Sequence, residues 1–165
     1  MKNISERLIK LMNYRIEQEE ISSRLYKAMA VWLDFKGFNG AAKLWYKYSD
    51  EEQKHAQWAY QYLLDLDVKP TVPTIPQPQG DFSGLVDIVN QSYAHEQAIT
   101  EQCQNLAAEA WKEGDYMTVH LAQHYLDEQI EEIKKSSLWV NMIEIYGTSK
   151  ESLFLLDNKM AEYAE

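Results

Sequence analysis

The side chains best suited to chemistry are ligand-type residues near the middle of four amphipathic segments. They are Glu19, Glu52 with His55, Glu96 and Gln129. Each falls on the apolar face of its segment, where a buried carboxylate is costly to desolvate and tends to take up a proton. Several carboxylates at one level of a helical core therefore need to be neutralised. A pair of metal cations would do this.

The spacing of these residues predicts an asymmetric two-metal site. Glu52 and His55 are three residues apart, so both point to the same side of a helix. One metal ion would bind Glu19, Glu52 and His55. The second ion would share Glu52 and use Glu96, with Gln129 as a weak neutral ligand. Oxygen ligands with few imidazoles suit iron or manganese better than copper.

The elements that position these ligands are predicted to be helices of similar length, since apolar residues recur at three- and four-residue spacing. We expect helices at about 4–35, 41–66, 83–112, 115–146 and 150–163. Asn3 or Ser5 would cap the first, Asp115 the fourth and Ser149 the fifth. We see no strand pattern. The prediction is an all-α single domain, 1–165, with a four-helix bundle and a short fifth helix at the C-terminus.

The segment 67–82 contains all four prolines of the chain. In extended polyproline geometry, at about 3.1 Å per residue, it would cover roughly 45–50 Å. A helix of 28–30 residues is about 42–45 Å long. We therefore expect a crossover that runs the length of the bundle and makes the second and third helices parallel. Neither flank could bury its apolar stripe alone, which argues against a linker between two domains.

Other polar residues lie close to this predicted centre. Tyr26, two turns beyond Glu19, is either core packing or a phenol that bonds a ligand carboxylate or gives an electron. Glu51, Glu128, Glu131 and Glu132 are either a solvated face or a third cation position. His95, His120 and His124 have no comparable constellation, so we expect surface or interface positions for them.

Composition excludes several classes of function. The chain has 165 residues and a formal net charge of -10, with no basic stripe for phosphates, so nucleic acid is not an expected partner. No stretch approaches 18 uninterrupted apolar residues, and the N-terminus lacks a signal-type apolar core, so no membrane span is expected. The single cysteine, Cys103, fits a reducing cytoplasm.

Four local strings make the chain resemble a bacterial non-haem ferritin over nearly its whole length. They are SSRLY, DEEQKHAQ, YAHEQAIT and YLDEQIEE. The resemblance implies that Glu19, Glu52, His55, Glu96 and Gln129 form the ferroxidase centre, with Tyr26 as the family's tyrosine beside it. It implies a third iron site at Glu51, Glu128, Glu131 and Glu132. It also implies a hollow shell of 24 chains, where Fe(II) is oxidised by O2 or H2O2 and Fe(III) is stored as a mineral.

Some features depart from related families. The stretch that would correspond to the carboxylate-lined three-fold pore of animal ferritins has Val119 and Ala122, which favours iron entry through each bundle instead. The second helix has no methionine, so we expect no haem. Two alternatives remain open. One is a non-storage di-iron oxidase or peroxidase of the rubrerythrin type, and the other is a shell protein with a vestigial metal site.

Overall fold

The computed structural model of the protein describes residues 4–165 and contains five helices in this part of the chain. They are α1 (Glu6–Phe35), α2 (Asn39–Asp65), α3 (Leu85–Glu113), α4 (Tyr116–Tyr146) and α5 (Lys150–Tyr163). Within 4–165 there is no strand, and the predicted helix bounds differ from the observed ones by two residues at most. None of the described helices is long and apolar enough to cross a membrane.

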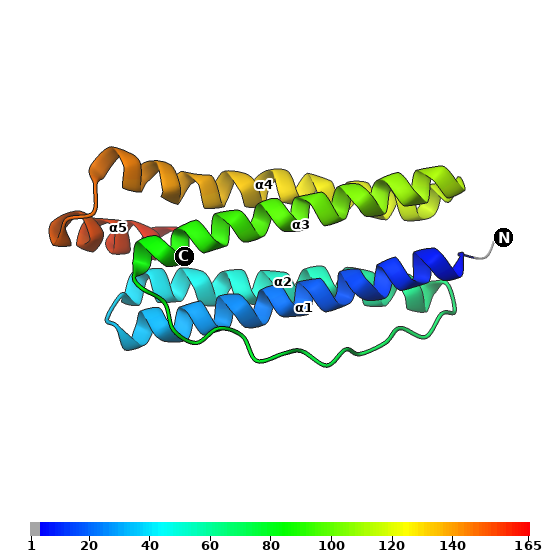
Figure 1. Ribbon diagram of the computed structural model, residues 1–165, viewed down its shortest axis with the longest axis horizontal. Helices are drawn as coiled ribbons and strands as arrows, with labels where there is room; N and C mark the ends of the chain where they lie inside the picture. Colours follow the sequence, from blue (N-terminus) through cyan, green and yellow to red (C-terminus); the bar gives the residue numbers. More distant parts are fainter. Residues whose placement is uncertain (1–3) are drawn as a thin grey trace.

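The helices form two antiparallel hairpins, α1 with α2 and α3 with α4 (Figure 1). Gly37 and Gly114 supply the positive φ angles, 88° and 65°, that the two hairpin turns use. Residues 66–84 run beside α1 along the length of the bundle, from the end of α2 back to the start of α3 (Figure 1). The helices α2 and α3 are therefore parallel, as the proline-rich segment predicts.

The helix ends use local caps and one cap from a distant element. Ser5 Oγ accepts from the backbone of Leu8, Asp115 Oδ1 from Thr118 and Ser149 Oγ from Ser152. Asn3, the other candidate cap of α1, lies outside the described residues. The first turn of α2 has no such local cap. Instead Asp157 on α5 accepts a 2.7 Å bond from the backbone N of Ala41, which ties α5 to the bundle.

The interior is an apolar core divided by a polar layer. One apolar cluster includes Met29, Trp45 and Trp139, and it extends to α5. A second cluster, nearer the other end, includes Ile16, Leu63 and Leu106. Between them, every helix of the bundle buries polar side chains, and the predicted ligands are among these. The polar layer therefore lies at the middle of all four helices.

The structure corrects the expectation that Val119 and Ala122 correspond to residues that line a three-fold pore between chains. Val119 and Ala122 are only 7% and 0% exposed, inside the bundle, so neither can line a pore outside it. Tyr116, Met117 and His120 are the exposed residues of the same part of α4. The expectation was wrong because Val119 and Ala122 belong to the apolar face of α4, which packs into the core.

Candidate metal centre

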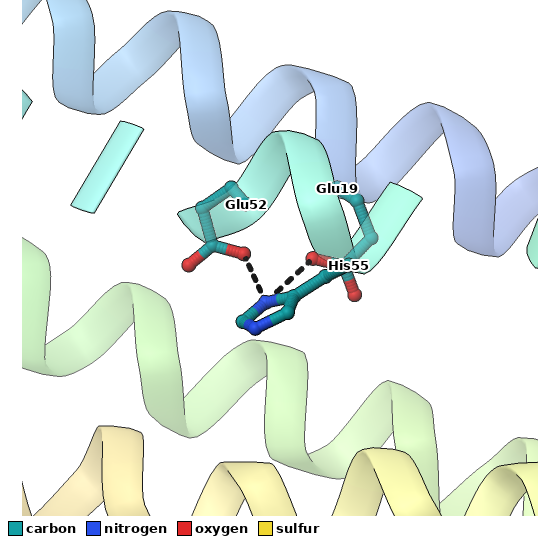
Figure 2. Close-up of side chains that lie close together, drawn as sticks. All are labelled: Glu19, Glu52 and His55. Carbon is teal, nitrogen blue, oxygen red and sulfur yellow. Dashed lines mark hydrogen bonds and ion pairs between the residues drawn. The ribbon is translucent and has the colours of Figure 1, made fainter. Parts of the chain in front are cut away.

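The inner part of the centre joins α1 to α2 through Glu19, Glu52 and His55, all of them buried (Figure 2). The Nδ1 atom of His55 lies 3.0 Å from Glu52 Oε2 and 3.8 Å from Glu19 Oε2. Each of the three offers a ligand atom within 4.8 Å of the others. This is the cluster that the sequence assigns to the first metal ion.

A second cluster of the same kind contains Glu52, Glu96 and Glu132, also buried. The two clusters therefore have Glu52 in common. Gln129 Nε2 donates to Glu96 Oε2 at 3.1 Å, so the amide supports a ligand carboxylate. Glu132 lies in the second cluster, whereas the sequence indicated only a possible third cation position for it. It lies three residues after Gln129 and brings a third carboxylate to this cluster.

Burial and mutual repulsion dominate the electrostatics of these carboxylates. The pKa of Glu52 is raised well above its ordinary value by burial and by the neighbouring Glu19 and Glu96. Burial also raises the pKa of Glu96, and it raises that of Glu132 to about 8. Burial lowers the pKa of His55, although Glu19 opposes the shift. Without a cation the centre therefore holds protons on carboxylates and keeps its imidazole neutral, the form that binds metals.

Tyr26 lies against the second cluster. It is 2% exposed, and its hydroxyl donates to Glu96 Oε1. The ring of His95 packs edge-on against it at 5.7 Å, and His95 Nε2 lies 2.7 Å from Ser22 Oγ. His95 is thus half-buried beside the centre rather than at a free surface, and burial lowers its pKa to about 4. His120 and His124 are exposed, as expected.

Arg15 is a buried cation next to Glu19, and the sequence analysis did not identify it. Its guanidinium is 2% exposed and its Nε lies 2.8 Å from Glu19 Oε1. It also donates to Gln102 Oε1 at 3.0 Å and lies 3.5 Å from the buried sulfur of Cys103. The signal was present, because Arg15 precedes Glu19 by four residues and so shares its helix face.

A second missed cation, Lys135, lies on the outer side of the centre. Its Nζ atom is 2.9 Å from Glu132 Oε1 and 3.3 Å from Glu51 Oε2. Although partial burial opposes it, these carboxylates raise the pKa of Lys135, so the side chain stays protonated. The i,i+3 spacing from Glu132 was the available signal.

Of the four glutamates expected to form a third iron site, two lie in a cluster of potential ligands within residues 4–165 and two do not. Glu128 Oε1 lies 3.5 Å from His55 Nε2, and Glu128 and Glu132 form a third cluster of potential ligands with His55. Among the described residues, neither Glu51 nor Glu131 belongs to any such cluster. Glu51 pairs with Lys135, and Glu131 is exposed.

The donor set fits a hard or borderline divalent cation. Carboxylate oxygens dominate, one imidazole is present, and no thiolate comes within the clusters. Glu19 Oε2 is buried and has no hydrogen-bond partner, although it points toward His55 (Figure 2). A buried carboxylate oxygen without a donor is costly, and a bound cation would satisfy it.

Comparisons with known proteins identify the family and the fold. The ferritin-like domain family matches residues 9–145. A bacterial non-heme ferritin of Escherichia coli O6:H1 is 32% identical over 154 residues, which are 93% of each chain. One from Campylobacter jejuni is 29% identical and covers 98% of this chain and 96% of its own. The open pore ferritin of Archaeoglobus fulgidus superposes with a TM-score of 0.94 at 25% identity, over 98% of each chain.

The fold and the centre together define a class: helical bundles with a long crossover that bury carboxylates and a histidine between their four helices. Within that class, the matches over most of the chain are to ferritins. The chain belongs to the ferritin-like family.

Proposed function

We propose that the protein is an iron-storage ferritin that oxidises Fe(II) at a two-metal ferroxidase centre and keeps Fe(III) as a mineral inside a hollow shell. The observation that carries the proposal is the pair of overlapping clusters that share Glu52. They supply two adjoining cation positions from four different helices. The buried, unpartnered Oε2 atom of Glu19 is the second support, because a bound cation would satisfy it.

The proposed ligands follow the two clusters. Glu19, Glu52 and His55 bind the first Fe(II), and Glu52, Glu96 and Glu132 bind the second, while Gln129 holds Glu96 in place. Two Fe(II) ions give up one electron each. O2 takes these two electrons and two protons to become H2O2, or H2O2 takes them to become water. Carboxylates that hold protons in the metal-free centre release them as iron binds.

Tyr26 is proposed to act beside the metal ions. Its hydroxyl donates to Glu96, so it orients that ligand and stabilises its negative charge. It is also the phenol nearest the second cluster, which would let it supply an electron when only one Fe(II) is bound.

Assembly into a shell of 24 chains in the cytoplasm is part of the proposal. The isolated chain exposes large apolar side chains at both ends of the bundle, and burying them against other copies would be favourable. Phe35, Phe154 and Leu155 lie at one end and Trp111 and Tyr116 at the other, each more than three-fifths exposed. Light scattering should give the mass of a closed shell, whereas a monomer would contradict it.

The test is to add excess Fe(II) in air to the assembled protein and count the ferric iron that stays soluble. We expect hundreds of iron atoms per particle. The variant Glu52→Gln should lose most of the oxidation rate, because it removes the shared ligand. The exposed Glu101→Gln, on the same bundle but away from the centre, is the matched control and should behave as the parent chain.

Other outcomes would favour the alternatives. About two ferric ions per chain, with the rest precipitating, would identify a non-storage oxidase or peroxidase. No retained iron would mean that the centre is vestigial. We also expect no haem, since α2 lacks a methionine. A Soret band in proportion to the protein would contradict that expectation.

A further inference from the structure

The outer side of the centre already contains a positive charge that belongs to the chain. Lys135 reaches from α4 and places its ammonium between Glu132 and Glu51, at 2.9 and 3.3 Å. Its side chain is 35% exposed, so it is neither free in solvent nor sealed inside. It lines a small cavity together with Tyr26, Glu96 and Glu132, next to the second cluster.

This ammonium competes for the same ligand atoms that another metal ion would need. A cation at this position would draw on Glu132 and Glu51, and both now face Lys135. The remaining candidate group there, His55 with Glu128 and Glu132, also depends on Glu132. A divalent ion bound by Glu132 and Glu51 would lie close to the ammonium of Lys135. Two positive charges at so short a distance repel each other strongly.

Glu132 can pair with Lys135 and contribute to the second cluster at the same time. It accepts from Lys135 with Oε1 and also belongs to the cluster with Glu52 and Glu96, and the two oxygens of a carboxylate can serve different partners. Lys135 can therefore occupy the outer position without dismantling the two inner ones.

We propose that Lys135 is a tethered cation that occupies the outer side of the centre and limits each chain to two firmly bound metal ions. The inference rests on the proposed two-metal centre and adds to it a residue that sets the metal count. Removing the ammonium should free Glu51 and Glu132 and create a third position, completed by Glu128.

The experiment counts bound metal rather than activity. Metal-free assembled protein is titrated with Co(II) by calorimetry, and bound Co(II) is counted after equilibrium dialysis. The parent chain should bind two ions per chain, and Lys135→Met should bind three. Lys135→Arg keeps a positive charge and should bind two. Lys134→Met is the matched control: it removes an exposed charge one residue away and should also bind two.

Each outcome decides the matter. Three ions on the parent chain would mean that a metal ion displaces the ammonium, which overturns the inference but leaves the two-metal centre intact. Two ions on Lys135→Met would overturn it as well. No bound Co(II) on the parent chain would refute both the inference and the two-metal centre. If Lys135→Met fails to assemble, Lys135→Gln tests the same loss of charge with a polar side chain.

Discussion

At the scale of residues, buried charges around the centre are held in pairs. Arg15 and Glu19 form one such pair, and both side chains are 2% exposed. The Nη2 atom of Arg15 has no hydrogen-bond partner, so the guanidinium depends heavily on Glu19 and Gln102. Breaking a buried pair leaves an uncompensated charge, which costs far more than the loss of a surface contact.

We expect Arg15→Met to lower the stability of the metal-free protein by about 3–5 kcal/mol, the usual cost of removing one partner of a buried pair. Arg7→Met is the control, because Arg7 pairs with Glu109 but is 65% exposed. Its partner Glu109 is buried but keeps a second cation, Lys112, so removing the exposed Arg7 should cost much less than removing Arg15. Thermal unfolding of both variants measures the difference, and equal shifts would contradict the account of Arg15.

Tyr26→Phe should separate ligand positioning from metal binding. The variant keeps the ring in the core but removes the hydroxyl that donates to Glu96. Without this bond Glu96 is held less well at the proposed second iron position, and a misplaced group at a reacting centre costs about tenfold or more in rate, so we expect iron oxidation to slow by about that factor. The number of bound Co(II) ions should not change. An unchanged oxidation rate would reduce Tyr26 to core packing.

At the scale of elements, α5 is joined to α2 by an unusually close approach. A Cβ atom at Gly40 would lie 2.0 Å from the backbone oxygen of Asp157 and 3.0 Å from Ala161 Cβ. The first contact is with backbone, so it cannot be relieved by a side-chain rotation. Only glycine fits here, and the cap from Asp157 to Ala41 depends on the same approach.

Gly40→Ala should therefore push α5 away from the bundle, at a cost of about 1–3 kcal/mol or more. Gly80→Ala is the control, because nothing lies within 4 Å of its added Cβ. Hydrogen exchange should show faster exchange in α5 for Gly40→Ala alone. Equal protection in both variants would mean that α5 adjusts without undocking.

The helices and the crossover could be predicted because their signals are local. Spacing of apolar residues predicted the helices, and the prolines predicted a crossover over 67–82, where the structure has a non-helical segment of residues 66–84. Most residues of the buried clusters could be singled out because they lie near helix midpoints. Lys135 and His95 could not be placed in the same way. Their partners Glu51 and Ser22 lie on other helices, so the contacts depend on how the hairpins pack.

At the scale of the whole molecule, the metal-free centre should reverse the common pH dependence. The folded pKa values of Glu52, Glu96 and Glu132 are raised, that of Glu132 to about 8. The folded chain thus binds more protons than the unfolded one, and this stabilisation is lost as pH rises. His55 and His95 have lowered pKa values and act in the opposite direction, mainly below about pH 7.5, because an unfolded imidazole is half protonated near 6.5.

We therefore expect the metal-free protein to become less stable from about pH 7.5 to 8.5, where the buried carboxylates still lose protons and the imidazoles of the unfolded chain are already largely neutral. Thermal unfolding across this range measures the slope. Saturating Co(II) should raise the unfolding temperature and abolish or invert the slope, because metal binding needs deprotonated ligands. Stability that rises with pH in the metal-free protein would contradict the raised pKa values.

The crossover has a consequence for how the chain comes together. It divides the molecule into two hairpins (Figure 1), and the proposed ligands are split between them: Glu19, Glu52 and His55 lie on the first, and Glu96 and Glu132 lie on the second. Each hairpin forms from contacts close in sequence, which is the fast step of helical folding. Segment 66–84 connects the two hairpins and keeps them at a high effective concentration relative to each other. Iron bound at the proposed centre would join the two hairpins, so a chain made in iron-poor conditions should separate most readily between them.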